Sequence, residues 1–343
     1  MAKSDLYKKA GVDIDAATRA LKAAKAAIKS TFNKNVATDI GSFGGVYRIS
    51  KDKMLVSSTD GVGTKLAIAQ EMGIHDTVGQ DIVNHCVNDI LVMGAKPLFF
   101  LDYFGTGKLE GSVLVKVISG MAKACRENNC VLIGGETAEM PGTYKPGDYD
   151  LVGTIVGEIN NGRIITGEKV RPGDIVLGLP SVGLHTNGYS LARKVFKDRG
   201  VSYRKVFREL NGPLYRAMLK PHKSYLSSVY PLIGKFFPYV HGIAHLTGGG
   251  FYDNIIRVLP EKTRCIIKNG SWPVLPVFKL IQKTGNVGDE EMHRVFNMGI
   301  GMTLIVDRSK AGAVKEFLAS RKERVYEIGK IEKAEKSVII EGI

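Results

Sequence analysis

The sequence contains little cysteine and no long apolar run, and each scarcity excludes a class of protein. Its 343 residues include four cysteines, Cys86, Cys125, Cys130 and Cys265, without a C-x-x-C pair or a zinc-binding spacing. We therefore expect buried, reduced thiols rather than disulfides or a zinc site. No stretch of about 18 uninterrupted apolar residues occurs, which argues against a membrane span.

The first residues also lack the marks of a targeting segment. Residues 1–6 have no apolar signal core, and Asp5, Asp13 and Asp15 argue against a transit peptide. A hydrophobic content of 44% and a charged content of 24% are typical of a soluble globular protein. We expect a cytoplasmic protein whose length allows two domains of ordinary size.

Acidic residues are fewer than basic ones, and the formal net charge is +14. A basic protein can bind nucleic acid, a membrane surface or small polyanions. Here the lysines and arginines are spread along the chain, and the densest stretch, at 321–336, is interleaved with glutamates. No aromatic and basic signature of an RNA-binding module or zinc finger is present. We therefore expect mostly solvated surface charge, part of which attracts phosphorylated ligands, and no nucleic-acid partner.

No P-loop of the form G-x-x-x-x-G-K-[ST] occurs, but Asp60-Gly61-Val62-Gly63-Thr64-Lys65 follows a strand-like run at 54–59. Backbone N–H groups at Gly61, Gly63 and Thr64 can approach phosphate oxygens. Lys65 can neutralise phosphate charge, and Asp60 can hold Mg²⁺ or position a metal-bound water. Taken alone, the segment fits an ordinary tight turn equally well.

Three further segments pair glycines or amides with acidic or hydrogen-bonding side chains. They are Val87-Asn88-Asp89 on an expected helix, the glycine-bounded segment 134–142 after an expected strand, and segment 183–190 between a strand and a helix. With Ala10-Gly11-Val12-Asp13-Ile14-Asp15 and His245-Leu246-Thr247-Gly248-Gly249-Gly250, they closely resemble the aminoimidazole ribonucleotide synthetase family. These are the phosphoribosylformylglycinamidine cyclo-ligases of purine biosynthesis. The resemblance runs in order from about Tyr7 to Gly301.

The resemblance implies a two-domain fold of mixed α and β elements. Residues 1–168 would form an N-terminal ATP-binding and dimerisation domain, whose mixed sheet completes a barrel with the same domain of a second subunit. Residues 169–343 would form a C-terminal α/β domain, with the active site in the cleft between the domains. The implied partners are ATP, Mg²⁺, formylglycinamidine ribonucleotide and a second copy of the chain.

The resemblance also implies the metal and catalytic residues. Asp60, Asp89 and Glu136 would organise Mg²⁺, while Lys65 and the glycine N–H groups stabilise phosphoryl charge. His185 would transfer a proton or contact an oxyanion, because it lies in a loop beside helix N–H groups. His85 has no such support and is expected to be a packed or surface histidine.

Further residues are assigned to the nucleotide and the substrate. Asn187 is a candidate substrate ligand, and so is the loop Thr247-Gly248-Gly249-Gly250, which could seat a phosphate before a helix. The family's N-terminal region lies over the nucleotide, which makes Lys25 a weak candidate for phosphate contact. A solvated face is the usual interpretation of such lysines. The family usually has serine where Thr186 stands, and residues 201–240 match it poorly and suggest no chemistry.

Apolar periodicity and turn residues predict the secondary structure. We expect a domain junction at Arg171-Pro172-Gly173-Asp174 and a loop around Glu136 and Glu139. The predicted helices are 15–30, 78–93, 109–127, 189–196 and 251–258, and the predicted strands are 46–49, 54–59, 97–103, 130–134, 151–159 and 175–179.

Two alternatives to the cyclo-ligase stay open. One is another superfamily enzyme that phosphorylates a different substrate, such as a thiamine-phosphate kinase, which would form ADP without ring closure. The other is a basic nucleic-acid-binding protein without catalysis, which would show salt-sensitive binding and no ATP turnover.

Overall fold

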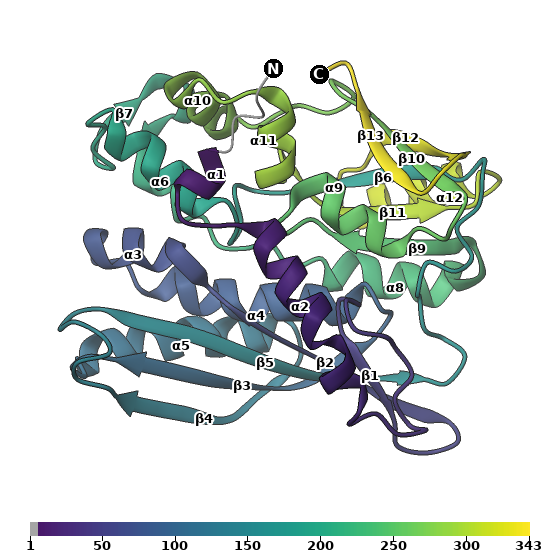
Figure 1. Ribbon diagram of the computed structural model, residues 1–343, viewed down its shortest axis with the longest axis horizontal. Helices are drawn as coiled ribbons and strands as arrows, with labels where there is room; N and C mark the ends of the chain where they lie inside the picture. The colour runs from purple at the N-terminus through teal and green to yellow at the C-terminus, as the bar shows by residue number, and fades with distance from the viewer. Residues whose placement is uncertain (1–5) are drawn as a thin grey trace.

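The computed structural model describes residues 6–343, and these residues form two units, each built around its own sheet (Figure 1). The first sheet has five strands in the order β1-β2-β5-β3-β4, and the second has six in the order β13-β10-β12-β6-β11-β9. The chain passes from one sheet to the other between Asn160 and Ile175. The lack of an apolar core and the acidic Asp5, which argued against a targeting segment, fall on residues 1–5, outside the described residues.

The first half of the chain supplies the elements of the first unit and also α1, which packs against the second unit (Figure 1). They are α1 (Leu6–Lys9), α2 (Ile14–Lys29), β1 (Gly45–Arg48), β2 (Lys53–Gly61), α3 (Leu66–Met72), α4 (Asp76–Leu91), β3 (Lys96–Thr106), α5 (Gly111–Glu127), β4 (Val131–Glu139) and β5 (Tyr149–Asn160).

The second unit follows, with a two-stranded hairpin beside its main sheet. Its elements are β6 (Ile175–Pro180), α6 (Tyr189–Asp198), β7 (Val206–Phe207), β8 (Gly212–Pro213), α7 (Leu214–Met218), α8 (Leu226–Phe236), β9 (Val240–His245), α9 (Gly250–Ile255), β10 (Thr263–Lys268), α10 (Pro276–Gly285), α11 (Asp289–Val295), β11 (Ile300–Val306), α12 (Ala311–Ser320), β12 (Tyr326–Lys333) and β13 (Ser337–Glu341).

The helices and strands predicted from periodicity are all present, and most ends agree within a few residues. The second unit was expected to be an α/β domain, a class in which parallel strand pairs are typical. In the described residues its main sheet has one parallel pair, β10 with β13, and its other pairs are antiparallel. The whole is therefore an α+β fold with mixed sheets. All four cysteines are free and buried, as predicted. Among the described helices, none is long and apolar enough to cross a membrane.

The loop predicted around Glu136 is wrong, because β4 continues to Glu139. Its residues from Gly134 onward pair in parallel with β3, from Leu101 opposite Gly134 to Thr106 opposite Glu139. This regular ladder satisfies the backbone hydrogen bonds of the segment and outweighs the weak strand preference of its two glycines. Glu136 is therefore held on an edge strand.

Helix α4 lies between the two units and fixes their relation (Figure 1). Apart from its first two residues, every residue of α4 is buried. Its apolar side contacts the first sheet, and its polar side meets the loop before α8. Asn84 donates to the carbonyl of His222 at 2.7 Å, and Asn88 donates to the carbonyl of Lys223 at 2.9 Å. The polar groups of a buried helix face are thus satisfied by backbone of the second unit.

The other face of the first sheet lacks a covering helix in the described chain (Figure 1). Along β5 the residues facing α4 are buried, while the alternate residues are only partly buried. On the edge strand β4, Val131 is 60% exposed and Ile133 is 61% exposed. A sheet with one partly apolar, uncovered face and an unpaired edge favours association with another protein surface.

Helices α4 and α5 pack closely because glycines stand where they meet. A Cβ atom added to Gly79 would lie 2.1 Å from the carbonyl oxygen of Val117, and one added to Gly120 would lie 2.0 Å from that of Asp76. Both distances are far below van der Waals contact. The seating of α4 on α5 therefore requires glycine at both positions.

We predict that Gly120→Ala lowers the free energy of unfolding by about 1–3 kcal/mol, because the added methyl group must push α4 away from α5. Gly111→Ala is the matched control on the same helix, since a Cβ atom added there would have no other atom within 4 Å. It should leave stability unchanged or raise it by up to about 1 kcal/mol. Urea unfolding followed by circular dichroism measures both, and equal effects would contradict the packing argument.

Candidate active site

Polar groups gather where the end of β2, the polar face of α4 and loops of the second unit meet. Asp81, His85 and Asp89 recur at every fourth position of α4 and therefore share one face. Asp60 comes from the end of β2. Asp81, His85 and Asp89 are at most 5% exposed, whereas the Asp60 side chain is 41% exposed. The site is thus buried on the helix side and open near Asp60.

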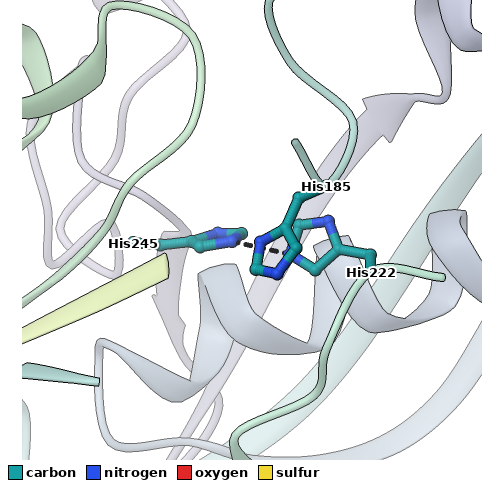
Figure 2. A group of neighbouring side chains, drawn as sticks. All are labelled: His185, His222 and His245. Atoms are coloured by element: carbon teal, nitrogen blue, oxygen red, sulfur yellow. Dashed lines mark hydrogen bonds between the residues drawn. The ribbon is translucent and has the colours of Figure 1, made fainter. Parts of the chain in front are cut away.

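The second unit contributes three buried histidines from three segments (Figure 2). His185 lies between β6 and α6, His222 lies between α7 and α8, and His245 ends β9. The Nε2 atoms of His222 and His245 are 3.0 Å apart. The ring of His185 stacks on that of His222 with centroids 4.0 Å apart, and neither of its nitrogens has a hydrogen-bond partner in the described chain.

A continuous series of contacts links these histidines to the carboxylates of the first unit. His85 Nδ1 lies 2.7 Å from the hydroxyl of Thr186, and that hydroxyl lies 3.3 Å from His222 Nδ1. His245 Nδ1 in turn lies 2.8 Å from a carboxylate oxygen of Asp89. The series therefore runs from His85 through Thr186, His222 and His245 to Asp89.

One assignment of protons satisfies every contact in this series. A hydroxyl donates one hydrogen bond and can accept two. In this assignment His85 Nδ1–H donates to the Thr186 hydroxyl, and that hydroxyl donates to His222 Nδ1. His222 Nε2–H then donates to His245 Nε2, and His245 Nδ1–H donates to Asp89. The assignment requires neutral His222 and His245, and it leaves His85 Nε2 as the end that faces Asp60.

The charges around His85 agree with this assignment. Burial works against a charged imidazole, but Asp60, Asp89 and Asp81 together outweigh it and raise the pKa of His85 to about 9. His85 Nε2 lies 2.9 Å from an Asp60 oxygen, in an ion pair whose N–H is not aligned for a good hydrogen bond. His85 is therefore a cation held between carboxylates at neutral pH.

The three histidines of the second unit differ from His85. Burial lowers the pKa of His185 and of His222 well below the usual value, and neighbouring histidines add to the effect. Burial also lowers the pKa of His245, although Asp89 opposes it. All three imidazoles are thus neutral near pH 7, the form that accepts protons or binds metals.

Lys65 ties the two units together beneath this cluster. Its ammonium group is fully buried, lies 2.8 Å from Asp81, and donates to the carbonyls of His185 and Lys220 at 3.1 and 2.7 Å. The three N–H groups of a lysine therefore all have partners within the chain. In this conformation Lys65 holds the backbone of His185 in place and has no donor left for a phosphate.

The other residues of the phosphate-type segment lie at the strand end. The N–H of Gly61 donates to its neighbour Asp60 at 2.7 Å, so it is already engaged. Gly63 has a φ of +69° and faces open space, and Thr64 contacts the hydroxyl of Ser190 at 3.1 Å. The predicted tight turn is thus a strand end followed by one turn of 3₁₀ helix at Gly63–Lys65.

The two predicted substrate loops of the second unit adjoin each other. A Cβ atom on Gly248 would lie 3.3 Å from the side-chain oxygen of Asn187. Thr247 donates to Asn254 at 3.1 Å, and Asn254 donates to the carbonyls of Gly248 and Gly250 at 3.2 and 2.8 Å. Gly249 has a φ of +89°. Asn254 therefore fixes the shape of the glycine loop, a role absent from the sequence interpretation.

Glu136 does not join Asp60 and Asp89 within one chain. It pairs with Tyr103 of β3, whose neighbours Phe100 and Phe104 mark the α4 side of the sheet. Glu136 therefore points to the opposite, uncovered face. Three strand spacings, roughly 14 Å, also separate β4 from β2.

Lys25 lies outside the cluster. It pairs with Asp39 at 3.0 Å, and its side chain is 43% exposed. Helix α2 nevertheless crosses the junction between the units (Figure 1). An ion pair of 2.6 Å between Asp15 and Arg294 holds its first turn against α11 of the second unit. The helix thus lies over the junction, while the Lys25 ammonium is engaged at its edge.

Sequence interpretation missed two residues of the cluster. His85, expected to be a packed or surface histidine, is buried between two carboxylates, and its position midway between Asp81 and Asp89 is the signal that could have revealed it. His222 lies in the region that suggested no chemistry. Its contacts, Thr186 and His245, come from distant segments, so no local pattern marks it.

Comparisons with known proteins cover nearly the whole chain. Residues 41–159 match the family model "AIR synthase related protein, N-terminal domain", and residues 171–341 match "AIR synthase related protein, C-terminal domain". A phosphoribosylformylglycinamidine cyclo-ligase from Brevibacillus brevis is 45% identical over 99% of both chains. Another from Caldicellulosiruptor saccharolyticus is 48% identical over 97% of this chain and 99% of its own.

Solved structures share the fold at low sequence identity. The thiamine monophosphate kinase of Aquifex aeolicus has a TM-score of 0.64 and 16% identity, covering 94% of this chain and 96% of its own. The hydrogenase maturation protein HypE in complex with ATP has a TM-score of 0.60 and 18% identity, covering 92% and 86%. These two likenesses support the fold alone.

We predict that Lys65→Met destabilises the protein by about 3–5 kcal/mol, because it leaves the carboxylate of Asp81 buried without its cation. Adding Asp81→Leu should recover part of the loss, since the buried charge is then removed as well. Lys25→Met, which breaks an exposed ion pair, is the control and should change stability little. Urea unfolding tests all three variants. A Lys65→Met variant as stable as wild type would contradict a stabilising role of the buried Lys65–Asp81 ion pair.

Proposed function

The chain belongs to the AIR synthase family, and from this premise we propose that the buried junction between its two units is where the family's reaction takes place. The chain is an enzyme of the ligase class that converts formylglycinamidine ribonucleotide to aminoimidazole ribonucleotide in purine biosynthesis, with release of ADP and phosphate. One observation carries the location: Asp60, Asp89 and His185, from three separate motifs, meet there. The proposed setting is the cytoplasm.

The chemical difficulty of the reaction is that an amide oxygen is a poor leaving group. Transfer of the γ-phosphoryl group of ATP to that oxygen gives an iminophosphate. The amidine nitrogen then forms a bond to the same carbon, the C–O bond breaks, and phosphate leaves with the former amide oxygen. The attacking nitrogen loses a proton as the ring closes. The protein must therefore stabilise phosphoryl charge and accept a proton.

His185 is the proposed residue for proton transfer or oxyanion contact. Burial keeps its imidazole neutral, and its ring nitrogens have no partner among the described residues. Its backbone carbonyl is held by Lys65. This supports a positioned base whose nitrogen is free for the substrate. Lys65 would then act mainly by positioning His185, and Asp89 by positioning His245.

Asp60 and Asp89 are the proposed ligands of Mg²⁺ in each chain. Each has a carboxylate oxygen near His85 Nε2, at 2.9 and 3.7 Å, so the two carboxylates lie close together, and His85 would have to move aside for one ion to bind both. This donor set fits Mg²⁺. The ion, when bound, neutralises phosphate charge. The same two carboxylates position His85, whose positive charge faces the open end of the site.

A second copy of the chain is the proposed source of the third carboxylate. Glu136 lies on the uncovered face of the first sheet, where Val131 and Ile133 of the same strand expose apolar side chains. Pairing of two such faces in a homodimer would form the proposed barrel and bury these residues. For the partner subunit's Glu136 to join Asp60 and Asp89, its carboxylate would have to pass around the end of β2, because Asp60 lies on the α4 face of the sheet.

The remaining contacts are assigned to phosphate groups. Gly63 and Thr64 follow Asp60 in the chain, and with Gly61, once its N–H is released from Asp60, they are the proposed nucleotide-phosphate ligands. The loop Thr247-Gly248-Gly249-Gly250 and Asn187 lie side by side and are proposed for the phosphate of the substrate. Lys25 on α2 is proposed to contact the nucleotide after release from Asp39.

Subunit complementation tests the shared site. Asp60→Asn and Glu136→Gln should each lower turnover by at least about 10²-fold, because a neutral amide replaces a metal-binding carboxylate. If Glu136 acts across the dimer, refolding a mixture of the two variants restores one intact site per mixed dimer, roughly a quarter of wild-type activity overall in a two-fold symmetric dimer. Asp198→Asn, on the exposed end of α6, is the activity control.

Mixtures as inactive as the separate variants, with mixed dimers demonstrated by mass spectrometry, would refute the contribution across the dimer. A monomeric wild-type protein in light scattering would refute the dimer itself.

Isotope labelling tests the reaction. Substrate carrying ¹⁸O in the amide should release phosphate that contains one labelled oxygen, because that oxygen leaves with the phosphoryl group. Ring product should form only when ATP is present, and mass spectrometry of the phosphate gives the answer. Unlabelled phosphate during ring closure would exclude the iminophosphate route.

A further inference from the structure

The cluster of His185, His222 and His245 has a feature that the hydrogen-bond series does not explain. His185 is 1% exposed, yet both ring nitrogens lack a partner among the described residues. A buried polar atom without a partner costs about 1–3 kcal/mol. A ligand that binds a ring nitrogen of His185 would remove this cost.

We propose that His185, His222 and His245 form a binding site for a divalent transition-metal ion of the zinc class. One nitrogen from each ring lies within 4.8 Å of the others, and all three residues are buried. Figure 2 shows the three side chains as neighbours, with the hydrogen bond between His222 and His245 drawn as a dashed line. Three imidazoles with one open position are a known ligand set of catalytic zinc.

The distances require a small adjustment. Zinc binds imidazole nitrogen at about 2.0–2.1 Å, so tetrahedral ligand atoms stand roughly 3.4 Å apart. The Nε2 atoms of His222 and His245 are 3.0 Å apart in a hydrogen bond, which the ion would replace. His185, whose nitrogens are free among the described residues, is stacked on His222 and would have to turn and shift its ring so that one nitrogen faces the two Nε2 atoms.

The groups behind two of the rings support the site. A metal-bound histidine usually directs its other ring nitrogen to a carboxylate, carbonyl or water, which fixes the ring. His245 Nδ1 is 2.8 Å from Asp89, and His222 Nδ1 is 3.3 Å from the Thr186 hydroxyl. Both rings therefore present Nε2 to the same point.

The site differs from the proposed Mg²⁺ site in its chemistry. Nitrogen donors favour Zn²⁺, Co²⁺ or Ni²⁺, whereas Mg²⁺ prefers oxygen donors such as Asp60 and Asp89. His222 also lines a pocket of ≈ 350 Å³ together with Asn84, Asn128 and Ser224. An ion bound there withdraws His185 from proton transfer, so Zn²⁺ should inhibit ring closure while it stabilises the fold.

Cobalt spectroscopy tests the proposal without the enzymatic reaction. Metal-free full-length protein titrated with Co²⁺ in excess Mg²⁺ should develop the visible d–d bands of a four- or five-coordinate ion, saturating at one ion per chain. Zn²⁺ should abolish the bands. His222→Asn should weaken Co²⁺ binding at least about 10-fold, by the loss of one ligand. His75→Asn, which alters a histidine at the start of α4, should bind like wild type.

Several results would overturn the proposal. They are an octahedral Co²⁺ spectrum, intense sulfur charge-transfer bands that indicate cysteine ligands, or unchanged bands in His222→Asn that is folded by circular dichroism. If that variant does not fold, a wild-type titration without tetrahedral bands still refutes the site. Because the bands do not depend on ring closure, failure of the metal site and failure of the proposed reaction are distinguishable.

Discussion

The burial of a polar helix face between two sheets is the constraint on which the rest of the structure depends. Helix α4 cannot leave Asp81, His85 and Asp89 unpaired, because each buried polar group without a partner is costly. Partners come from both units: Lys65 bonds both Asp81 and the His185 carbonyl, and Asp81 accepts from the N–H of His222 at 2.6 Å. The contacts that join the two units are therefore the same contacts that build the site.

The two faces of the first sheet have different roles. One face is buried under α4 and α5, and it carries Asp60 to the junction. The other face holds Glu136 and the exposed apolar side chains of β4. If Glu136 is a metal ligand as proposed, another surface must cover this face. The proposed metal site and the open sheet face would then depend on the same contact.

The two proposed roles of the histidine cluster exclude each other at any moment. With no ion present, one set of proton positions satisfies Thr186, His222 and His245, and it leaves His185 neutral and free to accept a proton. With a transition-metal ion, the bond between His222 and His245 is replaced and His185 becomes a ligand. The same burial lowers the pKa of all three histidines and therefore favours both states.

Apolar periodicity and turn residues are local properties of the chain, so they predicted the helices and strands, and the resemblance of the motifs, in their order along the chain, indicated the family. The motifs also led to the prediction of Asp60, Asp89 and His185 as site residues. Three features became evident only in the folded chain. Lys65 is buried against Asp81, Glu136 faces away from Asp89, and His222 contacts His245. Each of these depends on which groups from separate elements meet when the chain folds, and local pattern carries no information about that pairing.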